Sequence, residues 1–119
     1  LRINTLRSTT IYKEFQQAAK NEKTNLQNEQ SNSKWELLKE AIDTAYPDFT
    51  AKIRMLCPSL SDREMKVCLL TKVNISPSGI ANVLKCSRQA ITNIRMRLFK
   101  KVTEYNQDFT DFDHFIGAF

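Results

Sequence analysis

Glycine, proline and histidine are scarce in this chain of 119 residues, which contains two glycines, three prolines and one histidine. A fold of many β-strands needs glycine and proline in its tight turns, so their scarcity argues against an all-β protein. No glycine-rich phosphate-binding loop and no nucleophile–base pattern occur, and catalysis has no support. No apolar run is long enough to cross a membrane. Because the apolar spacing is helical throughout, we expect an all-α domain. Because no catalytic pattern is present, we expect that it is not an enzyme and needs no cofactor or metal.

Cysteine is present but gives no sign of a disulfide framework. Cys57, Cys68 and Cys86 are odd in number and form no CxxC pair, so we interpret them as small buried apolar residues in a reducing compartment. The chain begins with Leu1 instead of Met, which we interpret as the start of a fragment of a longer, cytoplasmic polypeptide. His114 has no metal-ligating neighbours in the sequence and is expected at the surface.

Positive charge is concentrated in one segment. The net charge is +5, but residues 61–102 alone carry nine Lys and Arg against two acidic residues, whereas residues 103–119 carry four acidic residues and no Lys or Arg. Charge focused on a short segment indicates a polyanionic partner. A solvated basic face that binds nothing would have the same composition, so charge alone leaves both interpretations open.

The first half of the chain predicts three helices. Residues 1–20 show weak helical periodicity, and residues 20–33 form either a polar helix end or a linker. The sequence Ser-Lys-Trp-Glu at 33–36 has the pattern of a capping box and predicts the start of a helix that ends near Pro47. A shorter helix is expected over 49–56.

Three further helices are expected within residues 60–102. Each begins with a residue that can cap it: a second capping box at 61–64, Ser76 before a proline, and Ser87. We expect the three helices to span about 62–72, 77–84 and 88–105, with a turn at Lys85-Cys86.

The very short turn between the last two helices is typical of a helix-turn-helix. Such a motif needs a small residue where the helices cross, as at Ala81, and apolar residues on the inner faces. The inner faces carry Val67, Cys68 and Leu70 on the first helix, Ile80 and Leu84 on the second, and Ile91, Ile94 and Leu98 on the third. We therefore divide the chain into an N-terminal helix with a polar connector (1–32) and a helical, wingless domain (33–119), which holds the motif at 60–102 and a C-terminal helix at about 108–119.

These residues resemble a known family. Leu60-Ser-x-Arg-Glu64, Val67-Cys-x-Leu70, Ser76-x-x-x-Ile80-Ala81-x-x-Leu84 and Ser87-x-x-x-Ile91 are similar to the LuxR/GerE (NarL/FixJ-type) helix-turn-helix effector domain. The flanking residues resemble the C-terminal domain of Bacteroidetes regulators with upstream tetratricopeptide repeats and a membrane-spanning helix. The resemblance implies a bacterial transcription regulator of that architecture.

Three residues depart from the family pattern. Gly79 stands where the family usually has Glu, Cys86 replaces Ile or Val in the turn, and Ala90 replaces Thr. Gly79 is expected to lower helix stability by roughly 1 kcal/mol relative to Ala. Ala90 removes a hydroxyl that could contact a phosphate.

We predict that the helix at 88–105 enters the major groove of DNA. Recognition helices contact base edges with polar residues in their first turns. Amide side chains can read adenine, whereas long cationic side chains bind phosphates. The predicted base contacts are Gln89, Thr92, Asn93 and Met96, and the predicted phosphate contacts are Arg88, Arg97, Lys100 and Lys101.

The predicted partner is double-stranded DNA, bound by a homodimer because one recognition helix contacts too few base pairs for specificity. No small-molecule ligand is evident. One alternative is region 4 of a sigma factor attached to RNA polymerase, which fits poorly with the segment 35–56 and with the acidic, Phe-rich tail. Another is a helical protein-interaction module that no longer binds DNA, which the positive charge of residues 61–102 argues against.

Three expectations concern tertiary contacts. Residues 33–56 should pack on the helix-turn-helix, because Met65 and Leu69 would otherwise be exposed. Glu64 and Arg95 should pair inside the domain, since Arg95 lies near the buried stripe of its helix. The Phe-rich stripe at 109–119 forms either a dimer seam or a contact with residues 1–56, and the intramolecular contact is favoured.

Overall fold

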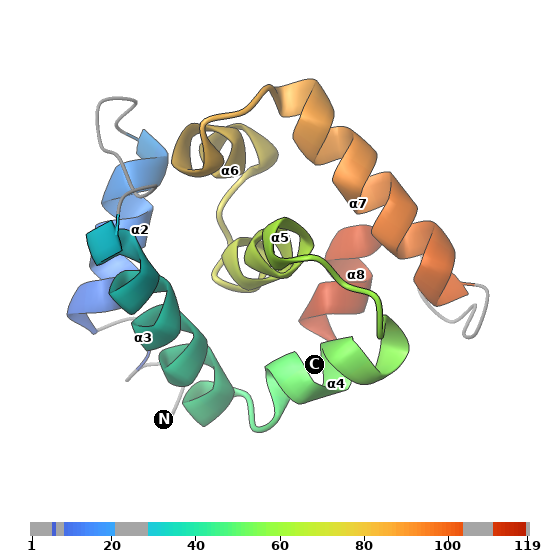
Figure 1. Ribbon diagram of the computed structural model, residues 1–119, viewed down its shortest axis with the longest axis horizontal. Coiled ribbons are helices and arrows are strands. Elements are labelled where there is room, and N and C mark those ends of the chain that lie inside the picture. The colour runs from blue at the N-terminus through green and yellow to red at the C-terminus, as the bar shows by residue number, and fades with distance from the viewer. Residues whose placement is uncertain (1–5, 7–8, 21–28, 104–110, 119) are drawn as a thin grey trace.

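The computed structural model describes residues 6, 9–20, 29–103 and 111–118, and side-chain burial within α3 from Ser33 onward. These residues form helices and no strand, so the protein is all-α (Figure 1). The helices are α2 (Thr10–Lys20), α3 (Glu29–Ala45), α4 (Phe49–Leu56), α5 (Asp62–Lys72), α6 (Pro77–Leu84), α7 (Arg88–Thr103) and α8 (Phe112–Gly117). None of them has the length and apolar character that a membrane span requires.

Helix α5 lies at the centre of the molecule, with α2 and α3 on one side and α7 on the other (Figure 1). Eight of its eleven residues are buried, on every side of the helix, as expected for a helix surrounded by protein. Helix α3 packs against α5 and brings Trp35 into the same core as Met65 and Leu69. The prediction that residues 33–56 pack on the following helices is confirmed for α3, which packs on α5.

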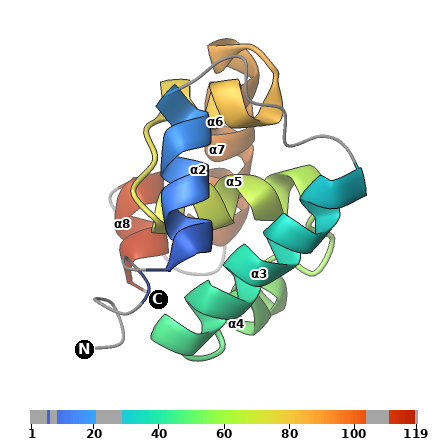
Figure 2. The same ribbon diagram turned by 90° about the vertical axis from the view of Figure 1, so that its left-hand side faces the viewer.

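Helix α2 packs along α6, side by side with it in both views (Figures 1 and 2). Two long-range hydrogen bonds hold it there: Gln16 Nε2 donates to the Val73 carbonyl at 2.8 Å, and Asn82 Nδ2 donates to the Ala19 carbonyl at 2.9 Å. Phe15 and Ala18 of α2 are buried. The N-terminal helix therefore shares the core of the following helices.

Gly79 allows this close approach. A Cβ atom at position 79 would lie 2.7 Å from Ile75 Cγ2, which is closer than such atoms pack, and 3.0 Å from the Ala19 Cβ, which is tighter than most such contacts. The glycine that lowers the intrinsic stability of α6 thus permits α2 to pack against it.

Local capping signals placed three helix starts correctly. Ser61 Oγ accepts from the Glu64 backbone N–H at 3.1 Å, and Glu64 Oε1 accepts from the Ser61 N–H at 2.9 Å, which completes the predicted box. Ser76 Oγ accepts from the Gly79 N–H, and Ser87 Oγ from the Ala90 N–H, both at 3.1 Å. These bonds satisfy backbone donors that the helices cannot satisfy themselves.

The predicted capping box at 33–36 is wrong as a helix start. Helix α3 begins at Glu29, so Ser33 lies in its second turn. Glu and Gln are good helix formers, and Glu29 and Gln30 extend the helix beyond the serine. Residues 21–28 of the polar stretch, the expected helix end at Tyr105, and Phe109 and Phe119 of the C-terminal stripe lie outside the described residues.

The C-terminal helix α8 packs inside the chain. Phe112, Phe115 and Ile116 are buried, and α8 contacts α5 and α7. Lys72 Nζ donates to the Ile116 carbonyl at 3.2 Å, which places a cation at the favourable, C-terminal end of α8. The intramolecular alternative is therefore correct: α8 packs mainly on α5 and α7, and its Ile116 and Gly117 line a pocket together with Tyr46. A dimer seam built on these three side chains is excluded because they are already covered.

The cysteines are free thiols, and Cys57 and Cys68 are buried whereas Cys86 is half-buried. Burial raises the pKa of the Cys57 and Cys68 thiols above its usual value. Both therefore stay protonated at neutral pH and act as small core residues. His114 is exposed, as expected.

Replacing Gly79 by alanine tests the α2–α6 contact. Alanine favours a helix, but the added methyl must displace Ile75 or α2, and overpacking of this kind costs about 1–3 kcal/mol. Gly79→Ala should therefore lower the free energy of unfolding measured by urea denaturation. Gly117→Ala is the matched control, because a Cβ there meets nothing within 4 Å. A Gly79→Ala protein as stable as the control would contradict the close approach.

Truncating Trp35 tests the core between α2, α3 and α5. Trp35 is 5% exposed. Its ring lies 4.6 Å from the Phe15 ring between centroids, and Lys66 Nζ lies 5.0 Å from its centroid. Trp35→Ala should lower the free energy of unfolding by about 3–5 kcal/mol. Leu37→Ala, on the same helix but exposed, should change it by no more than about 0.5 kcal/mol. Equal effects of the two substitutions in thermal denaturation would disprove this packing.

Candidate nucleic-acid interface

The arrangement of α5, α6 and α7 depends on a three-residue turn between the last two helices. Lys85 adopts a left-handed conformation, with φ 54°, and ends α6. The Cys86 backbone N–H donates to the Ala81 carbonyl at 3.1 Å, which closes the turn. Ala81 is buried, as a small residue at the crossing of α6 and α7 must be. The chain therefore turns sharply and lays α7 across α5.

Helix α7 has one buried and one open face. Ile91, Ile94, Leu98 and Val102 are buried, which confirms the predicted inner face of this helix. Figure 1 shows α7 at the edge of the molecule, with α5 and α8 on its inner side and no described helix on its outer side. The opposite face is thus available to a partner over the whole length of the helix.

The four predicted base contacts lie within the first nine residues of α7. Gln89, Asn93 and Met96 are exposed and Thr92 is half-buried, and the Met96 side chain is 66% exposed. Gln89 Nε2 donates to Asn93 Oδ1 at 2.9 Å, so the two amides lie side by side. Thr92 Oγ1 donates to the Arg88 carbonyl at 3.1 Å.

Three of the four predicted phosphate contacts share that open face. Arg88, Arg97 and Lys100 are exposed, and no ion pair joins them to a carboxylate in the described part of the chain. Lys101 is different: it is half-buried, and its charge acts on Cys57 and Glu64 at the junction of α4 and α5. The structure therefore places Lys101 on the flank of α7, away from Lys100.

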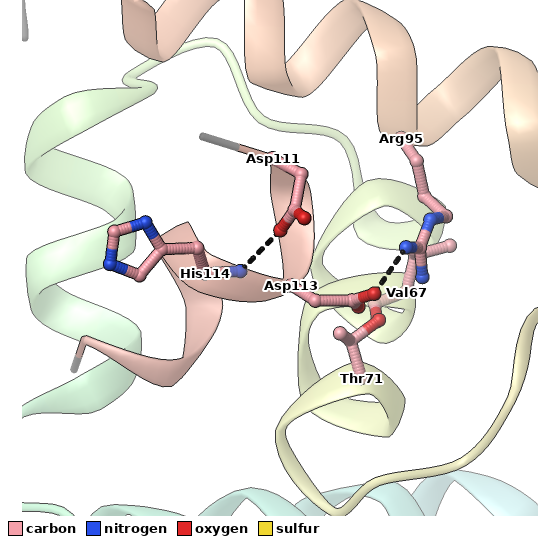
Figure 3. Close-up of polar contacts among 6 residues, drawn as sticks. All are labelled: Val67, Thr71, Arg95, Asp111, Asp113 and His114. Carbon is pink, nitrogen blue, oxygen red and sulfur yellow. Dashed lines mark hydrogen bonds and ion pairs between the residues drawn. The ribbon is translucent and has the colours of Figure 1, made fainter. Parts of the chain in front are cut away.

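The expected pair between Glu64 and Arg95 is wrong. Arg95 Nη2 instead lies 3.0 Å from Asp113 Oδ2 (Figure 3). The guanidinium also stands 5.0 Å from the centroid of the Phe112 ring. Arg95 does lie beside the buried stripe, with only 17% of its side chain exposed, but α8 supplies its partner. The ion pair and the ring contact join α7 to α8.

Glu64 is held by its own helix end. Burial raises the pKa of its carboxyl group. The opposing effects are larger: hydrogen bonds with the Ser61 backbone and hydroxyl and the positive charges of Lys101 and Arg97 all lower this pKa. The net pKa is therefore below the usual value. The carboxylate is therefore ionised at neutral pH. Because it is bound to Ser61 at the start of α5, it adds no unpaired negative charge to the open face of α7.

One cation beside this face was missed in the sequence. Arg63, in the first turn of α5, lines an open hollow of about 560 Å³ together with Ala90, Asn93, Ile94, Met96 and Arg97. A cation in the first turn of a helix is unfavourable for the helix dipole, and that sequence feature could have indicated a role outside folding. The proximity of Arg63 to α7 depends on tertiary packing, so the spacing of residues along the sequence could not predict it.

Comparisons of the chain with protein-family models, with curated proteins and with solved structures give no match. The resemblance to LuxR/GerE effector domains therefore stays a prediction that depends on the motif residues. The functional argument depends on the geometry of α5, α6 and α7 and on the charges of the open face.

Proposed function

We propose that this chain is a sequence-specific DNA-binding domain of a bacterial transcription regulator, with α7 as the recognition helix of a helix-turn-helix. One observation carries the proposal. The open face of α7 combines adjacent amide side chains with cations, and α7 contains five Lys and Arg and no acidic residue. A face of this composition, left uncovered by the rest of the fold, suits a polyanion that also presents hydrogen-bonding groups.

The dimensions of α7 suit the major groove. A helix of 16 residues is about 24 Å long, and the major groove of B-DNA is about 12 Å wide and admits an α-helix. Asn93 can hydrogen-bond an adenine through both its amide nitrogen and its amide oxygen, once that oxygen is no longer bonded to Gln89. The Met96 side chain and the Thr92 methyl can contact a thymine methyl group. The N-terminal half of α7 thus supplies the sequence-reading groups.

The exposed cations supply affinity and position. Arg88 lies at the start of α7, and Arg97 and Lys100 lie in its second half, so they can reach phosphates at the edges of the groove. Lys101 could bind a phosphate only by turning away from Glu64, and we expect its substitution to have the smaller effect. The free backbone N–H groups at the start of α7 add to the attraction for phosphate.

Two copies of the chain on one operator would give the specificity that a single recognition helix lacks. Because Phe112, Phe115 and Ile116 of α8 are buried within the chain, the contact between copies must use surfaces other than these side chains, or the DNA itself. Sedimentation equilibrium with a duplex selected from genomic fragments should give two chains per duplex. A ratio of one would contradict the dimer while leaving DNA binding intact.

Two substitutions on α7 should weaken DNA binding in different ways. Asn93→Ala should weaken binding to the selected duplex by about 1–3 kcal/mol and relax the preference at one base pair. Lys100→Ala should weaken all duplexes equally and flatten the dependence of log K on log salt by about one unit. Fluorescence anisotropy over a range of salt concentrations measures both effects.

The control for these variants is Lys13→Ala on α2, which removes an exposed charge on the opposite side of the molecule from α7 (Figures 1 and 2). It should leave affinity and salt dependence almost unchanged. If Asn93→Ala and Lys100→Ala behave like Lys13→Ala, the open face of α7 does not bind DNA and the proposal is wrong.

A further inference from the structure

Arg63 is an exposed cation that the fold does not use. Within the part of the chain that the structure describes, its side chain makes no hydrogen bond and no ion pair. The neighbouring carboxylates are engaged elsewhere: Asp62 binds Lys66 Nζ at 3.0 Å, and Glu64 accepts from the Ser61 N–H at 2.9 Å. Since the dipole of α5 also disfavours a cation in its first turn, Arg63 contributes nothing evident to folding.

The hollow that Arg63 lines has the composition of an anion site. Arg63 from α5 and Arg97 from α7 both contribute to its wall, and no acidic residue lines it. Two guanidinium groups that share one hollow repel each other, and an anion between or beside them removes that repulsion. Guanidinium groups also match a phosphate with paired, parallel hydrogen bonds.

Ala90 of α7 also lines the hollow, and its methyl group offers no hydrogen-bonding group to a phosphate. Arg63 supplies such a group from another helix. Asn93, the central base-reading candidate, lines the same hollow. An anion bound by Arg63 would therefore lie next to the base that Asn93 contacts.

We propose that Arg63 binds a backbone phosphate of the same duplex that α7 reads, and so fixes the rotation of α7 about its axis in the groove. This inference rests on the proposed function, because it needs α7 in the major groove. Helix α5 would then contact the DNA directly, in addition to supporting α7 from behind. With Arg97 on the other helix, it would hold one strand on the side of Asn93.

The test compares four proteins on the selected duplex and on an unrelated duplex, by anisotropy between low and moderate salt. Arg63→Ala should weaken binding to both duplexes by the same factor, roughly tenfold for a charged hydrogen-bonding contact, and flatten the salt slope by about one unit. Arg63→Lys should keep the slope, because the charge remains, and lose part of the affinity, because the fork is gone. Wild type and Lys13→Ala are the references.

Thermal denaturation separates this role from a structural one. Arg63→Ala should melt within about 3 °C of wild type, as expected for an exposed side chain without partners. If wild type binds and Lys100→Ala flattens the slope but Arg63→Ala does not, the inference is wrong and the proposed function stands. If wild type binds no duplex at low salt, both fall. A loss of binding by Arg63→Ala that accompanies a large drop in melting temperature would also overturn the inference.

Discussion

The burial of α5 on all its sides is the constraint on which the rest of this structure depends. A helix of 11 residues is too short to be stable alone in water, so it exists only because α3, α6, α7 and α8 each cover part of it. Each of these helices must turn its apolar face towards α5. For α7 this fixes which side is buried and, by exclusion, which side faces solvent. The position of the candidate DNA-reading face is thus a consequence of core packing.

The outer helices then fix the orientation of the pair α6 and α7. Helix α2 lies against α6 through the close approach at Gly79 and the bond from Asn82 to Ala19. Helix α8 holds α7 through the Arg95–Asp113 ion pair and the Phe112 ring. Because α6 and α7 are each held by a further helix, the short turn at Lys85 is not the sole restraint on the angle between them. A binding site on rigid, supported elements keeps its geometry better than one on loops.

Charged side chains near α7 are distributed in a way that suits a polyanionic partner. Among the described residues, the carboxylates near α7 are engaged: Asp113 binds Arg95, Asp111 caps α8, Asp62 binds Lys66, and Glu64 completes a helix cap. The cations of the open face have no such partners among the described residues. The positive potential is therefore concentrated where the amide side chains lie, so the same surface offers attraction for phosphate and hydrogen bonds for bases.

The sequence by itself determined the features that depend on neighbours three or four residues away. The caps at Ser61, Ser76 and Ser87 are bonds within one turn, and the inner stripe of α7 follows from helical periodicity, so the open face with Gln89 and Asn93 was predictable. The same local reasoning placed the start of α3 wrongly, because the preceding residues also favour a helix and nothing local decides between the two.

Only the tertiary structure decided the contacts between segments far apart in the chain. The partner of Arg95 lies on α8, the reason for Gly79 lies on α2, and Arg63 of α5 comes beside Asn93 of α7. None of these follows from spacing, since a charge or a glycine is compatible with many partners until packing brings one of them near. The sequence therefore specifies which residues face outward on each helix, whereas the packing around α5 specifies which of them meet.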